Sequence, residues 1–194
     1  MTVVEPMIVG SRSRQLSLLM VALLLFVGKV QALGVSIDSA STKNNKGVYQ
    51  LNADIRYALS EEVLEALNNG VAITMQLTIN IERPRAYLWD ESIATLLQRY
   101  SLKYHALSGQ YLVQSLNSGE QRSYLSLASA LRALGRIRDL PILNQASFKS
   151  TQGAVVRLRS KLDTNALPAP LRPVAWLSNE WKLSSEWFTC PLEF

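Results

Sequence analysis

The sequence is poor in the two residue types that most often build catalytic and metal-binding sites. Its 194 residues include one cysteine, Cys190, and one histidine, His105. A single cysteine excludes a disulfide within the chain, and a zinc site usually needs several histidine or cysteine ligands. We therefore expect no metal and no other cofactor. Cys190 itself is expected either to be buried as a small apolar group or to be a terminal thiol that a second chain can reach.

The sequence also lacks an apolar run long enough to cross a membrane. The longest run, residues 16–27, follows Arg12 and Arg14 and is followed by Val30-Gln31-Ala32. As a helix it would reach about 18 Å, whereas the hydrocarbon core needs about 20 residues. This arrangement is typical of a signal peptide, residues 1–32, that is cleaved after Ala32. We expect a periplasmic, exported domain of residues 33–194; the alternative is a protein anchored in the membrane by an uncleaved signal.

Neither sign of charge dominates the chain. Cleavage would remove Arg12, Arg14, Lys29 and Glu5, which lowers the formal net charge from +5 to about +3. The remaining charges are interleaved rather than gathered in blocks, so a nucleic-acid partner is not expected. No transmembrane segment would remain after cleavage.

Alternation of apolar and polar residues dominates the domain. The alternation is clearest in residues 49–59 and 71–82, and it predicts strands with one solvent-exposed face. Further strands are predicted at residues 35–37, 93–104, 111–116, 136–143, 156–162 and 181–187. Helical spacing occurs at residues 60–70 and 123–135. The pattern predicts a mainly β (α+β) domain, an antiparallel sheet or two-sheet sandwich of about seven or eight strands with two short helices.

The strand faces also predict which side chains share the core. Six apolar residues are expected to face one core: Leu51, Ile55, Ile73, Leu77, Leu102 and Leu158. Leu167 to Pro173 contains three prolines, which lack amide donors, so this segment is expected to be an extended strap outside the sheets. Arg172 in the strap is expected to be held either by a carboxylate such as Asp163 or by a partner.

Several motifs resemble those of a known family. They are Trp89-Asp90, Leu102-x-Tyr104-His105-x-Leu107-Ser108-x-Gln110-Tyr111, Leu162-Asp163 before Leu167-Pro168-x-Pro170-Leu171-Arg172-Pro173, and Trp181-x-Leu183-x-Ser185-x-Trp187. Over nearly all of the domain the chain resembles a proteobacterial family of exported proteins, domain of unknown function 4390. The resemblance implies no catalytic residues. Its members are often encoded beside a membrane sensor kinase, which implies an envelope or sensor-kinase protein as partner.

Local groupings of reactive residues favour structural roles. His105 precedes Ser108 by three residues across a predicted turn, and it is expected to bond to backbone near a strand end. Adjacent carboxylates, Glu61-Glu62 and Asp90-Glu91, point apart and so do not flank one bond as an acid and base. The four tryptophans at strand positions are expected to pack in the core more often than to stack on sugars.

The leading hypothesis is a non-enzymatic periplasmic interaction module. Arg157, Arg159 and Lys161 share one predicted strand face, which either is a solvated edge or meets anionic lipid or an acidic partner. The candidate contact residues are Arg172, Trp89, His105, Arg157 and Arg159. The alternative is a periplasmic hydrolase or carbohydrate-acting enzyme assembled from distant residues. An open pocket with two ionisable groups would favour the enzyme; an exposed strand edge or apolar groove would favour the module.

Overall fold

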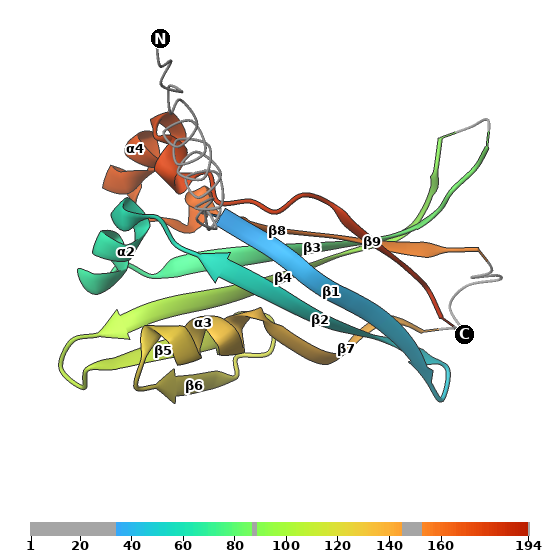
Figure 1. Ribbon diagram of the computed structural model, residues 1–194, viewed down its shortest axis with the longest axis horizontal. Coiled ribbons are helices and arrows are strands. Elements are labelled where there is room, and N and C mark those ends of the chain that lie inside the picture. Colours follow the sequence, from blue (N-terminus) through green and yellow to red (C-terminus); the bar gives the residue numbers. More distant parts are fainter. Residues whose placement is uncertain (1–33, 87–88, 145–152, 194) are drawn as a thin grey trace, which may run out of the picture. The chain divides into compact units, whose positions relative to one another are not determined.

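Nine strands form two antiparallel sheets in the part of the chain that the structure, a computed structural model, describes: residues 34–86, 89–144 and 153–193 (Figure 1). The chain divides into two units, residues 1–32 and 33–194, and the second contains both sheets. The predicted signal peptide and its cleavage site after Ala32 lie outside the described residues.

The smaller sheet has three strands in the order β1-β2-β7. Their bounds are Gly34–Asn45 for β1, Val48–Ala58 for β2 and Arg136–Asn144 for β7. A hairpin loop joins β1 to β2, where Lys46 and Gly47 have φ angles of 52° and 83°. Positive φ at both central residues gives the two-residue turn whose twist matches that of paired strands.

The larger sheet has six strands in the order β6-β5-β4-β3-β8-β9. Their bounds are Ile73–Arg83 for β3, Glu91–His105 for β4, Gln110–Ser115 for β5, Gln121–Tyr124 for β6, Val155–Leu162 for β8 and Phe188–Pro191 for β9. The mainly β, two-sheet prediction is confirmed. No helix in the described part of the chain is long and apolar enough to cross a membrane.

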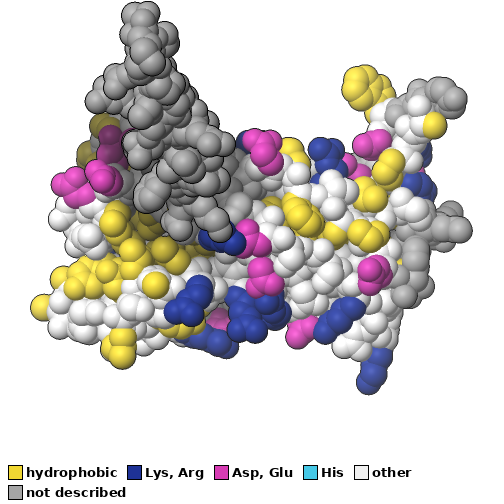
Figure 2. Space-filling model, viewed as in Figure 1, with side chains coloured by type: hydrophobic (Ala, Val, Ile, Leu, Met, Phe, Trp, Pro, Cys, Tyr) yellow, Lys and Arg dark blue, Asp and Glu magenta, His cyan; other side chains and the backbone are white. Residues whose placement is uncertain are grey.

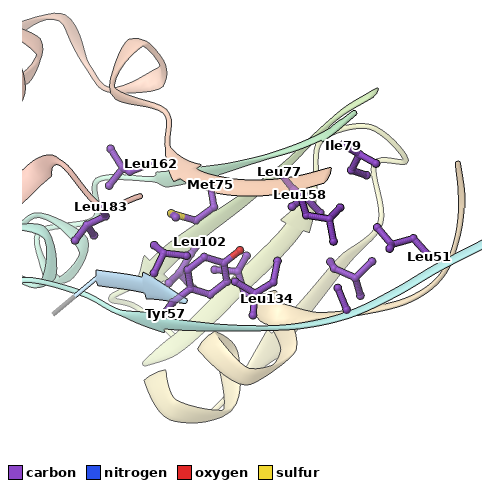
Figure 3. Packing of buried hydrophobic residues seen from close by; sticks show 14 of the residues in the cluster. Leu51, Tyr57, Met75, Leu77, Ile79, Leu102, Leu134, Leu158, Leu162 and Leu183 are labelled. Carbon is purple, nitrogen blue, oxygen red and sulfur yellow. The ribbon is translucent and has the colours of Figure 1, made fainter. Parts of the chain in front are cut away.

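A single core lies between the sheets (Figure 3). All six residues predicted to face it are buried, with at most 6% of any of them exposed: Leu51, Ile55, Ile73, Leu77, Leu102 and Leu158. They come from β2, β3, β4 and β8, whose alternate side chains point to the opposite sheet face. The period-two reading of these strands is therefore confirmed.

Both predicted helices are present. Helix α2 (Glu61–Asn68) is capped by Ser60, whose hydroxyl accepts a bond from the amide of Val63, and Gly70 follows it at φ 81°. Helix α3 (Leu127–Gly135) is capped by Ser126. It begins later than predicted because β6 pairs with β5 through residues 121–124. An edge pairing of only four residues leaves no clear alternation in the sequence.

The segment Leu167–Pro173 lies outside the sheets as predicted, but the prediction that it is extended is wrong. This region forms short helical turns: η2 (Thr164–Ala166), η3 (Ala169–Leu171) and α4 (Arg172–Leu177). Proline is compatible with the first turn of a helix, because the amides there have no intrahelical partner and the fixed φ of proline suits the helix. Pro170 and Pro173 occupy such first-turn positions in η3 and α4.

The strand predicted at residues 181–187 is also largely wrong. Asn179–Trp181 is a 3₁₀ turn, η4, and only an isolated bridge joins Ser184 to Lys161 before β9 begins at Phe188. Beside β8, the amide of Ser160 donates to the hydroxyl of Ser185 at 3.0 Å. A side chain thus takes the place of a backbone acceptor, and a regular ladder does not form.

Tryptophan burial departs from the prediction of core packing. Only Trp181 is buried, whereas Trp89, Trp176 and Trp187 are 92%, 61% and 38% exposed. Trp89 lies in the connection between β3 and β4, and Trp176 lies in α4. Three of the four indoles are therefore available to solvent or to a ligand.

The two sheets are linked at one side through Thr42 of β1. Its hydroxyl donates to the carbonyl of Pro191 at 3.0 Å and accepts from the amide of Glu193 at 2.8 Å. The side chain is buried. This seam joins β1 of the smaller sheet to the end of β9 in the larger one.

Replacing Thr42 with valine, which has nearly the same shape, is expected to lower the free energy of unfolding by about 1–3 kcal/mol. Valine removes both bonds and leaves the Pro191 carbonyl and the Glu193 amide without this partner. Urea unfolding measures the change. Thr95→Val on the exposed face of β4 is the control, with an expected change within about 0.5 kcal/mol. Equal stability of the two variants would show that the seam does not hold the sheets.

Candidate functional site: an arginine-lined cleft

A large cleft lies at the side of the sandwich opposite the Thr42 seam. The smaller sheet does not extend over β5 and β6, and α3 covers them instead. Between α3 and β7 on one side and β4, β5 and β6 on the other is a cleft of about 750 Å³. This volume falls within the range of roughly 300–1,000 Å³ that is usual for small-ligand sites.

Four arginines line this cleft, which we call the arginine cleft: Arg122, Arg132, Arg136 and Arg138. Figure 2 shows basic side chains gathered on this face of the molecule, over α3 and the beginning of β7. The lining contains one carboxylate, Glu120, which pairs with Arg122 at 2.6 Å between Oε1 and Nη2. The cleft therefore carries more positive than negative charge.

The local sequence brings three of these arginines together. Arg132 lies one helical turn before Arg136, where α3 gives way to β7. In β7 the side chains of Arg136 and Arg138 share a face and alternate with buried Ile137. Arg122 of β6 pairs in register with Val113 of β5, so both point to the inner face of the larger sheet.

Two of the arginines have no carboxylate partner among the described residues. Arg138 pairs with Asp54 of β2 at 2.5 Å, and this hydrogen bond lowers the pKa of the Asp54 carboxyl. Arg136 lowers the pKa of Asp54 through space only. Arg132 donates from Nε to the carbonyl of Ala128, and this bond leaves its terminal nitrogens available to a ligand. Arg132 and Arg136 are thus the positive charges that a ligand can neutralise.

The chemistry of this lining suits binding of an anion. A guanidinium group is charged at all physiological pH values and offers a planar set of donors that fits a carboxylate or phosphate. Burial raises the pKa of Tyr100, so its hydroxyl remains a neutral hydrogen-bonding group. Val113 and Leu140 add apolar surface. The lining therefore combines positive charge with apolar surface.

The sequence-predicted contact residues lie elsewhere. Arg157 and Arg159 are on the outer face of β8, with their guanidinium carbons 5.2 and 5.8 Å from the ring centre of Trp187. Arg157 also pairs with Glu82 at 3.2 Å, and Arg159 donates to the hydroxyl of Ser184 at 3.1 Å. They form a basic and aromatic surface rather than a solvated edge, since β9 pairs with the beginning of β8.

Trp89 and His105 lie at opposite ends of β4, a strand of 15 residues that spans about 50 Å. The ring of His105 was predicted to bond to backbone, but it contacts a side chain instead. Its Nδ1 lies 3.0 Å from the hydroxyl of Ser108, and both residues are exposed at the β4–β5 turn. These two predicted contacts therefore cannot share one small-ligand site.

Arg172 does not pair with Asp163, the carboxylate predicted for it. Its Nε donates to the carbonyl of Leu167 at 2.9 Å. Asp163 instead caps η2 by accepting from the amide of Asn165, and it lies 3.9 Å from Arg99. Because residues 164–171 fold into helical turns, Arg172 reaches a nearby backbone carbonyl rather than Asp163.

The remaining reactive residues have structural partners. Glu62 accepts bonds from Ser178 Oγ at 3.1 Å and Trp181 Nε1 at 2.9 Å, which fixes α2 to η4. Glu91 pairs with Arg85 and Arg83, and the hydrogen bond from Arg85 lowers its pKa. Cys190 is buried, and this burial raises the pKa of its thiol to about 11. Of the two predictions for Cys190, burial as a small apolar group is therefore confirmed. No three metal-ligating side chains gather within the described ranges.

The sequence contains a partial signal for the cleft. Arg132 and Arg136 lie at the end of the predicted helix, where basic side chains commonly complement the helix dipole. With Arg138 they place three arginines within seven residues. Their convergence with Arg122 depends on contacts between α3 and β6 that no local pattern indicates.

Comparison with known proteins identifies one family. The sequence model of a family described as Domain of unknown function (DUF4390) matches residues 32–191. No curated protein and no solved structure matches the chain.

Proposed function

We propose that this chain, which belongs to the DUF4390 family, is a non-enzymatic interaction module of the periplasm that binds an acidic segment of a partner protein in the arginine cleft. The observation that carries the proposal is the position of Arg132 and Arg136, which line a cleft of about 750 Å³ and have no carboxylate partner among the described residues. Neutralising these charges is the main interaction that the cleft offers.

An extended protein segment fits the shape of the surroundings. The cleft opens between β6 and β7, which are the edge strands of the two sheets. Edge strands present unpaired amides and carbonyls that an extended segment can bond. The expected export and the predicted envelope or sensor-kinase partner are consistent with this role.

An open cleft with ionisable groups was the feature expected if the protein were the alternative, an enzyme. The chemical identity of these ionisable groups favours binding instead. Arginine does not lose its proton at physiological pH and therefore does not act as a general acid or base. Glu120 is engaged by Arg122 through a hydrogen bond at 2.8 Å. An acid and base that flank one bond are not present in this lining, whereas two available guanidinium groups are.

The charge of the cleft predicts a preference between two peptides. The test uses a labelled octapeptide of alternating glutamate and valine, and its counterpart with glutamine in place of glutamate. Fluorescence anisotropy is expected to show tighter binding of the acidic peptide. Arg132→Glu with Arg136→Glu is expected to weaken that binding by at least about tenfold, because each arginine supplies charge-assisted hydrogen bonds.

The matched control is Lys46→Glu with Lys103→Glu, which changes the net charge equally at exposed positions outside the cleft. It is expected to retain most of the affinity. Equal binding of the two peptides by the wild-type domain, or equal loss in both double variants, would overturn the proposal. Thermal unfolding checks that both variants are folded.

A further inference from the structure

A second concave surface lies where β8 meets α4 and η4. This pocket of about 370 Å³ shares no residue with the arginine cleft, and we call it the tryptophan pocket. The residues that matter here are Arg159, Lys161, Trp176, Trp181, Lys182 and Ser184. They come from β8, α4, η4 and the segment that runs beside β8.

One indole in this pocket is fixed and one is free. Trp181 is buried, and its Nε1 donates to Glu62 Oε2 at 2.9 Å, so it forms a rigid wall. Trp176 is 61% exposed, because α4 buries only Ala175 against the domain. Holding an indole in solvent costs free energy, and exposed aromatic surface of this kind marks interaction sites.

Three cations surround the indoles. Lys161 has no carboxylate partner among the described residues, Lys182 donates to the side chain of Asn179, and Arg159 donates to Ser184. The lining itself contains no carboxylate. A ligand must therefore present negative charge to the lysines and an apolar face to Trp176.

We infer that the tryptophan pocket binds a saccharide that bears carboxylate groups. The C–H face of a sugar ring stacks on an exposed indole, and a ring hydroxyl finds a partner in Thr164 at the same pocket. Lys161 and Lys182 bind the carboxylate. A neutral sugar would leave the lysines unused, and a simple inorganic anion would leave Trp176 in water.

The charges around the pocket favour a single chain over a membrane surface. Helix α2 carries Glu61, Glu62 and Glu65, and it is bound to the neighbouring segment through Ser178 Oγ and through Ser60 Oγ, which donates to the carbonyl of Glu180. A flat anionic bilayer resting on α4 would meet these carboxylates. The only charged side chains that line the pocket are cations.

The test is calorimetric titration of the domain with a uronic acid trisaccharide and with the same trisaccharide after reduction of its carboxyl groups. The acidic sugar is expected to bind and to shift the tryptophan fluorescence, whereas the neutral one binds at least about tenfold more weakly, because it loses charge-assisted bonds. Trp176→Ala is expected to abolish binding, Trp176→Phe to retain part of it, and Lys161→Gln to weaken it roughly tenfold.

Trp89→Ala and Lys103→Gln change the same residue types at exposed positions outside the pocket and are expected to bind as the wild type does. The arginine-cleft variant Arg132→Glu with Arg136→Glu is also expected to retain sugar binding, which separates this inference from the proposed function. Equal binding of the two sugars overturns the inference. So does sugar binding that Trp176→Ala leaves intact, or binding only to vesicles of phosphatidylglycerol and phosphatidylcholine.

Discussion

Replacing Gly135 with alanine is expected to destabilise the domain by about 3 kcal/mol or more. Gly135 is the last residue of α3 and is buried against β2. A Cβ atom there would lie 1.9 Å from the carbonyl oxygen of Ile55 and 2.9 Å from its carbonyl carbon. Both are backbone atoms within a paired strand, so no side-chain rotation relieves the overlap.

The direction of the change in stability distinguishes the effect of packing from the effect of helix propensity. In an exposed helix, alanine is more stable than glycine by about 1 kcal/mol. Propensity alone would therefore make Gly135→Ala stabilising. Because overpacking a backbone contact outweighs that gain, chemical denaturation should show a clear loss of stability.

The control is Ala128→Gly on the exposed side of α3, which is expected to cost about 1 kcal/mol through propensity alone. A stability of Gly135→Ala equal to or above that of the wild type would contradict the close approach of α3 to β2. Displacement of α3 would also move Arg132 and Arg136. We therefore expect weaker binding of the acidic peptide by any Gly135→Ala protein that remains folded.

The sequence allowed prediction of the strands that carry the core. In β2 and β3 one face is buried and the other is polar, so alternation specifies both the strand and its orientation. The same alternation correctly assigned Leu102 and Leu158 to the core. These strands are long enough for their local pattern to be unambiguous.

The regions predicted incorrectly depend on single side-chain contacts or on very short pairings. Ser185 binds the amide of Ser160 in place of a regular ladder. Four residues of β6 pair with β5 without clear alternation. In α4, Pro173 starts a helix rather than prolonging an extended segment. Local pattern does not determine which of these outcomes occurs.

Neither proposed site could be assembled from the sequence, because each one gathers residues from distant segments. The arginine cleft joins Arg122 of β6 to Arg136 at the end of α3. The tryptophan pocket joins Lys161 of β8 to Trp176 of α4. Arg159, one of the predicted contacts, does line the tryptophan pocket, so the basic face of β8 was a partial indication of it.

The arrangement of the two sheets explains why the arginine cleft and the tryptophan pocket are separate. The Thr42 seam closes one side of the sandwich, and α3 covers the other side without filling it. The tryptophan pocket instead lies toward the end of β8, where Arg159 and Lys161 line it. A core mutation and a pocket mutation are therefore expected to have separable effects.

Leu158→Ala is expected to lower the free energy of unfolding by about 2–5 kcal/mol, because it removes buried apolar atoms and leaves a cavity. Leu158 lies in β8 between Ile79 of β3 and Phe188 of β9, and none of its surface is exposed. Figure 3 shows Leu158 in the core between the sheets. Denaturant titration measures the loss, and the slope of the unfolding transition shows whether the native state has changed.

Lys161→Ala on the same strand is the control for Leu158→Ala, since Lys161 is exposed and its loss is expected to change stability by less than about 0.5 kcal/mol. The two variants should behave oppositely in the sugar titration. Leu158→Ala should bind the uronic acid trisaccharide while it is folded, whereas Lys161→Ala should bind it weakly. The reverse result would mean that the two faces of β8 are exchanged, because a shift of one residue turns every side chain of a strand to the other side.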